Sequence, residues 1–265
     1  MEPYEVYALR YATAMRPAAQ SFLDADPHEA ALQLDYFVWL ARNAHRTVVI
    51  DTGFSAAAAR RRGREFLRSP AEALGLLGVD CARVETVVIT HLHYDHVGNF
   101  DQFARATFHL QDLELSYATG RYMAQRAFAH PYEVDEVVGM VRNVYAGRVT
   151  FHDGDGEVAP GLTVHHIGGH TLGLQSVRVW TRVGWLVLAS DASHFYANML
   201  EGRPFPIVAD VRRMADGWRR LRELASAPRH VVPGHDALVM RRYRPPRPEL
   251  EGIAVRLDDE PAGGV

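Results

Sequence analysis

The sequence of 265 residues contains no lysine, and all 29 of its basic residues are arginine. The absence of lysine excludes an enzyme that forms a Schiff base through a lysine amine, and it excludes the lysine of a phosphate-binding loop. The formal net charge is −3, so the chain also lacks the surplus of positive charge that is typical of nucleic-acid-binding proteins. We therefore expect no nucleic-acid partner.

Cysteine is nearly absent. The single residue, Cys81, excludes a disulfide within the chain and a cysteine-based zinc cluster. It lies in the segment Gly78–Ala82, directly before a predicted strand, and we interpret it as a small packed residue.

Long apolar runs are also missing. No stretch of the sequence is long enough to cross a bilayer, and Met1–Glu5 does not continue into the basic and apolar regions of a signal peptide. We expect a cytoplasmic protein with no membrane partner.

Strand and helix signals alternate along the chain. Apolar and β-branched runs predict strands at 6–11, 32–41, 46–50, 84–89, 107–110, 149–151, 162–164, 176–180, 185–188 and 230–232. Helical patterns cover 56–67, 70–77, most of 113–145 and 210–225, and the second of these begins with a capping box at Ser69. The stretch 16–29 reads as a loop. No linker or repeat is visible, so we predict one α/β domain over 1–265, with a loosely held tail from about 245.

One short stretch, Thr90–Gly98, concentrates four potential metal ligands directly after a buried strand. His91 and His93 are two residues apart, so in an extended chain their imidazoles point to the same side. Asp95 and His96 are consecutive and diverge once the chain turns into a helix. One segment could therefore supply ligands to two adjacent metal ions, an arrangement that is known from hydrolytic enzymes. The alternative is a histidine-rich surface turn, which the preceding strand and Gly98 disfavour.

The pattern His91-x-His93-x-Asp95-His96 resembles the signature of the metallo-β-lactamase superfamily. Further pieces of the family pattern occur in order: Asp51-Thr52-Gly53, Gly169-His170-Thr171-x-Gly173, Ser190-Asp191 and Pro233-Gly234-His235. The resemblance implies a four-layer αβ/βα sandwich. It also implies two divalent ions, zinc first and iron, manganese or cobalt as alternatives. One ion would bind His91, His93 and His170, the other Asp95, His96 and His235, with Asp191 bridging both.

The resemblance further implies a role for Asp51 behind the metal ligands, although Asp-Thr-Gly is also a common turn. A hydroxide bridging the two ions would attack the substrate, and Asp95 would relay a proton to the leaving group. The implied activity is hydrolysis of an ester bond. Since no Gly-x-Ser-x-Gly segment occurs, a serine hydrolase is disfavoured.

Within the superfamily the chain is most similar to the N-acyl homoserine lactonases, which share the segment Asp191-Ala192-Ser193. This similarity implies opening of a lactone ring, with N-acyl homoserine lactones and quorum quenching as the first expectation. The family has a carbonyl-orienting tyrosine three residues after the aspartate, where this chain has His194, with Tyr196 two residues further on. We expect one of these two residues to take that role.

Two alternatives stay open, namely hydrolysis of another ester or a thioester, as in glyoxalase II, and a non-catalytic scaffold that would be expected to have lost ligands. Aromatic and sulfur side chains are candidates for an apolar substrate-binding wall, although packing in the core explains them equally well. The candidates are Phe54, Tyr122, Phe128, Phe195, Met199 and Phe205. The family also suggests a homodimer.

Overall fold

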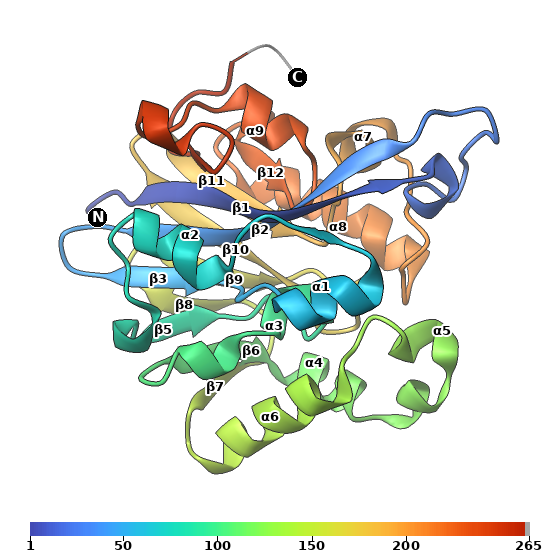
Figure 1. Cartoon of the computed structure of the whole chain (residues 1–265), viewed down its shortest axis with the longest axis horizontal. Coiled ribbons are helices and arrows are strands. Elements are labelled where there is room, and N and C mark those ends of the chain that lie inside the picture. The colour runs from blue at the N-terminus through green and yellow to red at the C-terminus, as the bar shows by residue number, and fades with distance from the viewer. Residues whose placement is uncertain (263–265) are drawn as a thin grey trace.

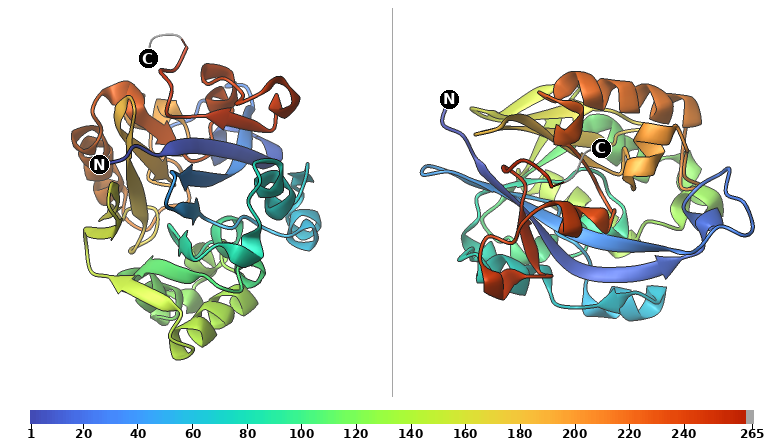
Figure 2. Two further views of the ribbon diagram at one scale, coloured as in Figure 1. Left: turned by 90° about the vertical axis from the view of Figure 1, so that its left-hand side faces the viewer. Right: turned by 90° about the horizontal axis from the view of Figure 1, so that it is seen from above.

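The computed structural model describes residues 1–262, which form two β-sheets packed face to face with helices on the outer faces (Figure 1). Figure 2, on the right, shows four layers in order: helix α8, the yellow strands of the second sheet, the blue strands of the first sheet, and helix α1. The predicted four-layer αβ/βα sandwich is confirmed.

The first sheet has the strand order β13-β1-β2-β3-β5-β6-β7, with β4 paired to β1. Its strands are β1 Glu5–Arg16, β2 Leu32–Arg42, β3 Thr47–Ile50, β4 Glu65–Phe66, β5 Thr86–Val88, β6 Thr107–Gln111, β7 Val149–His152 and β13 Ala254–Arg256. The second sheet has the order β12-β11-β10-β9-β8. Its strands are β8 Gly156–Ala159, β9 Leu162–His166, β10 Gln175–Thr181, β11 Gly184–Ser190 and β12 Val231–Pro233.

Helices connect and cover the sheets. The α-helices are α1 Ala56–Arg62, α2 Pro70–Leu76, α3 Tyr94–Val97, α4 Asp112–Ala118, α5 Arg126–Ala129, α6 Val134–Tyr145, α7 Tyr196–Glu201, α8 Val211–Leu224 and α9 Leu238–Arg242. Short 3₁₀ turns are η1 Ala18–Gln20, η2 Cys81–Arg83, η3 Phe100–Gln102, η4 Arg121–Ala124, η5 Pro228–His230 and η6 Pro248–Leu250. In the part of the chain that the structure describes, no helix has the length and apolar character to cross a membrane.

The two faces of β2 show how sequence alternation builds the layers. Tyr36 and Val38 point to the core beneath α1 and α2, whereas Phe37 and Trp39 point to the core between the sheets. Successive side chains of a strand point to opposite faces, so an apolar run of this kind is buried on both sides. The strand is therefore central, as its place between β1 and β3 requires.

The hairpin of β1 and β2 extends beyond the rest of the first sheet. Strand β3 pairs only with the segment Trp39–Arg42 of β2, whereas β1 continues to pair with β2 as far as Arg16 opposite Leu32. The strand predicted at 6–11 is thus longer than expected, and Arg16 ends a strand rather than beginning a loop. This overhang lies past the end of β3, where Asp51 follows.

The helix predicted over 56–67 is too long. Helix α1 ends at Arg62 because Gly63 adopts a left-handed φ of 63°, after which the chain enters β4. The capping box of α2 is confirmed, since Ser69 accepts from the main-chain nitrogen of Glu72 and Glu72 accepts from that of Ser69.

The prediction of a loose tail from about 245 is wrong for most of that segment. Strand β13 pairs antiparallel with β1, and Leu250, Val255 and Leu257 are buried in the two cores. The main-chain nitrogen of Val6 also donates to the Asp258 carboxylate at 3.0 Å. Proline and glycine in this segment shape its turns rather than prevent packing. Residues 263–265 lie outside the described part of the chain.

Candidate metal centre

Every predicted metal ligand lies directly beyond the end of a strand. The segment after β5 carries His91 and His93, and the one-turn helix α3 that follows carries Asp95 and His96. The remaining three ligands come from the second sheet: His170 lies between β9 and β10, Asp191 follows β11, and His235 follows β12. The ends of both sheets thus meet at one edge of the sandwich, and all seven side chains are buried.

The first ligand set consists of His91, His93 and His170. Nε2 of His170 lies 3.2 Å from Nε2 of His91 and 2.9 Å from Nδ1 of His93. Two nitrogens bound to one tetrahedral zinc ion at ~2.0–2.1 Å are separated by about 3.3 Å. The three nitrogens therefore surround a space that suits one ion.

The second ligand set consists of Asp95, His96 and His235, whose candidate ligand atoms lie within 4.8 Å of one another. Nε2 of His96 is 3.8 Å from Oδ1 of Asp95, and Nε2 of His235 is 3.9 Å from Oδ2 of the same residue. Mixed nitrogen and carboxylate ligands suit zinc and other first-row divalent ions.

Asp191 lies between the two sets and turns one oxygen toward each. Its Oδ2 is 3.2 Å from Nε2 of His170 and 3.9 Å from Nε2 of His91. Its Oδ1 is 3.2 Å from Nε2 of His96 and 3.0 Å from Nε2 of His235. This is the arrangement that a carboxylate bridging two ions requires.

Two polar atoms at the centre of the cluster have no hydrogen-bond partner among the described residues. They are Nε2 of His96 and Oδ1 of Asp191, both buried, which lie 3.2 Å apart without the geometry of a hydrogen bond. Buried polar atoms without partners are uncommon, and an unfilled ligand position is one explanation of them. The donor set and these orphaned atoms fit divalent metal ions.

The outer ring nitrogens of four ligands are fixed by neighbouring oxygens. Nδ1 of His96 is 2.8 Å from Oδ2 of Asp51, and Nδ1 of His91 is 3.2 Å from Oγ1 of Thr90. Nδ1 of His170 and of His235 lie 2.6 Å and 2.8 Å from the main-chain carbonyls of Ile207 and Asp35. Such contacts set the tautomer and turn the inner nitrogen toward a metal.

Asp51 and Ser190 both have left-handed backbone conformations, with φ values of 60° and 49°. Such values are uncommon for residues other than glycine and concentrate at functional sites. Thr90 connects the two residues, because its hydroxyl lies 2.8 Å from Oδ2 of Asp51 and 2.8 Å from Oγ of Ser190. The three strand ends are thus tied together directly behind the cluster.

Burial and charge set the protonation states in the cluster. Burial is the main cause that holds the pKa values of His91 and His93 well below their ordinary value. Burial alone would raise the pKa of Asp191, but His235 and the other imidazoles outweigh it and hold this pKa well below its ordinary value. His91 and His93 as neutral imidazoles and Asp191 as an ionised carboxylate have the forms that bind metal.

Sequence reasoning missed Glu114, a fully buried carboxylate on α4. Its Oε1 accepts from the nitrogen of Leu92 at 2.9 Å and the hydroxyl of Tyr132 at 3.2 Å. Its Oε2 accepts from Oγ1 of Thr171 at 2.6 Å and the nitrogen of Gly173 at 3.2 Å. A Cβ on Gly173 would lie 2.1 Å from the main-chain nitrogen of Glu114, so only glycine fits there. Glu114 therefore joins the two segments that carry the first ligand set.

A cavity opens over the cluster. Besides ligands of both sets it is lined by Arg16, Leu34, Tyr94, Pro131, His194 and Ile207. Arg16 and Leu34 come from the overhanging hairpin of β1 and β2. One feature of the sequence indicates that the first strand extends this far: residues 6–16 contain no glycine or proline, and the first proline after them is Pro17.

Of the two candidates for orienting a substrate carbonyl, the structure brings only His194 to the cluster. Nε2 of His194 is 2.8 Å from Oδ2 of Asp191, and burial is the main cause that lowers the pKa of His194 to about 3. Tyr196 instead begins α7 and is buried in the core of the second sheet, with the guanidinium carbon of Arg242 4.5 Å from its ring centre. Tyr196 is not among the residues that line the cavity over the cluster.

The six predicted substrate-binding residues do not line the cavity. Phe205 comes nearest, since its ring stacks on that of His194 at 3.7 Å. Phe54 packs among tyrosines behind the cluster, including Tyr94 at 5.4 Å, and Met199 is buried in the core. The other three residues are Phe195, which packs on Phe22, and Tyr122 and Phe128, which pack on each other. Core packing is the correct interpretation of Phe54 and Met199.

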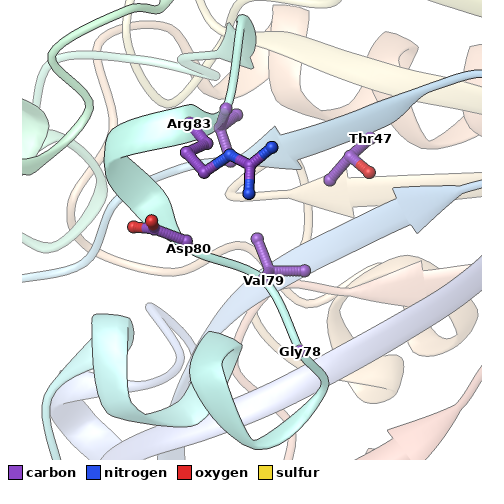
Figure 3. Close-up of a pocket in the computed structure, with 6 residues that line it drawn as sticks. Thr47, Gly78, Val79, Asp80 and Arg83 are labelled. Atoms are coloured by element: carbon purple, nitrogen blue, oxygen red, sulfur yellow. The ribbon is translucent and has the colours of Figure 1, made fainter.

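Figure 3 shows a different hollow. It lies near the start of β3, whereas Asp51 and the cluster lie beyond the end of that strand. It is lined by Thr47, which begins β3, and by Val79, Asp80 and Arg83. In residues 1–262, groups of three or more side chains placed to hold a metal occur only around the cluster described above. This hollow therefore offers no metal site of that kind.

The family model described as "Metallo-beta-lactamase superfamily" matches residues 33–235. Two proteins with similar sequences are N-acyl homoserine lactonases. AiiB of Agrobacterium fabrum is 27% identical over 205 residues, which are 71% of each chain. An enzyme of Bacillus thuringiensis is 24% identical over 245 residues, which are 83% of this chain and 91% of that protein.

Solved structures with this architecture include a quorum-quenching N-acyl homoserine lactone lactonase. It superposes with a TM-score of 0.75 at 21% identity and covers 89% of this chain and 94% of its own. An N-acyl homoserine lactone hydrolase with the product N-hexanoyl-L-homoserine at its catalytic metal centre gives a TM-score of 0.76 at 20% identity, with 91% and 96% covered. At this identity the superpositions establish the fold.

Proposed function

The chain belongs to the metallo-beta-lactamase superfamily, and on that premise we propose that it is a metal-dependent hydrolase that opens the ester bond of a lactone. The relatives named N-acyl homoserine lactonases support this substrate class. Water adds across the carbonyl carbon and ring oxygen, the bond between these two atoms breaks, and the product is a hydroxy acid.

The observation that carries the proposal is the orientation of Asp191. Each of its oxygens faces a separate group of histidines, at 3.2 Å from His170 on one side and 3.0 Å from His235 on the other. A site for a single ion would not need a carboxylate placed between two ligand sets. We therefore propose two ions, with the first and second ligand sets holding one each and Asp191 bridging them.

When bound, two divalent ions, zinc in the first instance, would supply an activated water as nucleophile and a Lewis acid for the substrate carbonyl. The chain's own residues hold the reactants. Asp51 and Thr90 keep the ligands of β5 and α3 in place through the contacts of 2.8 Å described above. Asp95 lines the cavity, and we propose that it passes a proton to the ring oxygen as that oxygen leaves.

His194 occupies the position where the resembling lactonases have a tyrosine. It lines the cavity, and its imidazole lies 2.8 Å from the bridging carboxylate of Asp191. We propose that His194 makes one of two contacts: it donates to Asp191 and keeps this carboxylate in its bridging orientation, or it presents its N–H group toward the substrate carbonyl. A neutral imidazole has one N–H donor, so the tautomer decides which of these contacts it makes.

The test combines metal analysis with turnover of a substrate panel. The panel contains N-acyl homoserine lactones of several chain lengths, simple γ- and δ-lactones, aryl esters, a glutathione thioester and a β-lactam. We expect two metal ions per chain, opening of lactones, and loss of activity in D191A. A matched control is D101N, because Asp101 is exposed and lies outside the cluster.

Turnover of esters or thioesters alone would overturn the lactone assignment while leaving the metal centre in place. A protein that binds no metal and turns over no member of the panel would overturn the enzyme proposal and favour a scaffold of the same fold.

A further inference from the structure

Arg16 is a buried arginine in the wall of the active-site cavity. Its side chain ends strand β1 at the overhang of the hairpin and is only 9% exposed. It lines the same cavity as His93, Asp95 and Asp191. Arg16 therefore lies beside the space in front of the candidate metal ligands.

The guanidinium group of Arg16 makes few hydrogen bonds within the protein. Its Nη2 donates to the hydroxyl of Tyr36 at 3.1 Å, while its buried Nε has no hydrogen-bond partner among residues 1–262. Arg148, in contrast, donates three bonds to main-chain carbonyls, and Arg42 pairs with the carboxylate of Glu5 at 3.0 Å. Arg10 and Arg242 also have buried nitrogens without a partner, but neither residue lines the cavity. A buried charge without a partner is costly, which indicates that a partner is missing.

We propose that Arg16 binds a carboxylate carried by the substrate, in addition to the ester group that is hydrolysed. This inference rests on the proposed function and narrows its substrate class to lactones that bear an anionic substituent. A guanidinium group presents N–H donors in a planar fork that matches a carboxylate.

The charge of the cavity supports an anionic ligand. The cluster contributes two carboxylates, Asp95 and Asp191, which two divalent ions more than neutralise. Arg16 adds a further positive charge, and no carboxylate among the described residues forms an ion pair with it. The other wall residues outside the ligand sets carry no negative charge that would pair with Arg16. They are the apolar Leu34, Pro131 and Ile207, together with Tyr94 and His194. A substrate that carries only a neutral acyl chain would leave the charge of Arg16 without a partner.

The kinetic test uses two lactones that differ by one group: γ-butyrolactone and the γ-lactone of 2-hydroxyglutarate, which carries a carboxylate beside the ring oxygen. We expect the metal-loaded wild type to prefer the carboxylated lactone in kcat/KM by about tenfold or more. R16Q should lose roughly 10- to 100-fold on that substrate and change less than about threefold on the neutral one, because a bond to a charged group is removed. Both enantiomers are tested.

A binding measurement shows whether Arg16 binds the additional carboxylate of the ligand or the carboxylate that ring opening forms. Calorimetry compares 2-hydroxyglutarate with 4-hydroxybutanoate, since both carry the carboxylate formed on ring opening and only the first carries another. R16Q should weaken the first by roughly 10- to 100-fold and the second by less than about threefold. R16K, which keeps the charge without the planar fork, should fall between wild type and R16Q.

The matched control is R64Q. Arg64 donates to the hydroxyl of Tyr94 at 3.2 Å and does not line the cavity, so both preferences should stay within about threefold of wild type. Equal losses on the charged and neutral ligands in R16Q would overturn the proposal, as would a wild-type preference for the neutral lactone. If thermal unfolding shows that R16Q does not fold, the losses of R16K on the charged and on the neutral ligands are compared in the same way. If no lactone is opened, including the N-acyl homoserine lactones of the panel above, the proposed function fails, and the binding measurement still decides the role of Arg16.

Discussion

Nε2 of His194 and Oδ2 of Asp191 lie 2.8 Å apart, and the same carboxylate oxygen faces His170 at 3.2 Å. His194 thus contacts the proposed bridging ligand from outside both ligand sets. The contact gives His194 a role that its stacking on Phe205 alone would not explain.

The first prediction concerns the variants H194F and H194Y. We expect H194F to lower kcat/KM on a lactone by about 10- to 100-fold with two metal ions still bound, because it removes a hydrogen bond to a charged group near the reacting atoms. H194Y should retain more activity, since a phenol can donate where phenylalanine cannot. Steady-state kinetics and metal analysis check both; loss of one ion in H194F would instead identify His194 as a metal ligand.

The second prediction concerns Asp51, whose carboxylate accepts from the nitrogen of Thr90 at 2.7 Å and lies 2.8 Å from Nδ1 of His96. We expect D51N to weaken metal binding by about 10- to 100-fold, because the imidazole of His96 loses the acceptor that fixes its tautomer. Competition with a chromogenic chelator measures this affinity. D101N serves as the exposed control, and an unchanged affinity in D51N would assign Asp51 a purely structural role at the turn.

The third prediction concerns Glu114, which accepts four hydrogen bonds in the protein interior. The amide of E114Q would direct donor hydrogens at two of these four donors. We expect the free energy of unfolding to fall by about 2–3 kcal/mol, since buried donors are left without acceptors. Urea unfolding of E114Q and of the exposed control E157Q measures the difference; equal stability of the two variants would contradict it.

The candidate metal ligands could be identified from the sequence because each belongs to a short motif that follows a strand. The apolar strand before His91 and those before Asp191 and His235 place these ligands at sheet edges, where the structure brings them together. Asp51 likewise follows a predicted strand, and its Oδ2 lies 2.8 Å from Nδ1 of His96.

The rest of the site depends on packing between segments remote in sequence. Glu114 and Arg16 belong to no motif, and only tertiary structure shows that one joins two ligand segments while the other enters the cavity. Tyr196 was a plausible neighbour of Asp191 in sequence, but α7 begins at Tyr196 and directs its ring into the core. The apolar candidates for substrate binding do not line the cavity. The sequence does not distinguish an apolar side chain in a cavity wall from one in the core.

The last prediction concerns pH and a histidine pair away from the metal centre. Nδ1 of His109 on β6 lies 3.0 Å from Nε2 of His152 on β7, and the two rings stack at 5.2 Å. Burial, followed by the neighbouring imidazole of His152, lowers the pKa of His109 to about 4. An unfolded chain has a histidine pKa of about 6.5, so protons bind the unfolded state more readily between these two values.

The sign follows from this difference. Stability from the neutral His109 is fully present above about pH 6.5 and is lost as the pH falls toward 4. We expect wild type to lose about 1–2 kcal/mol more than H109Q between pH 7.5 and pH 5, with each pKa unit worth about 1.4 kcal/mol and solvent near the pair reducing the total. Urea unfolding of the metal-free proteins at both pH values measures this, with H28Q as a control because His28 is exposed. All other histidines are the same in both proteins, so only the difference between wild type and H109Q reports on the pair. An identical loss in the two proteins would show that His109 takes up its proton in the folded state as readily as in the unfolded one.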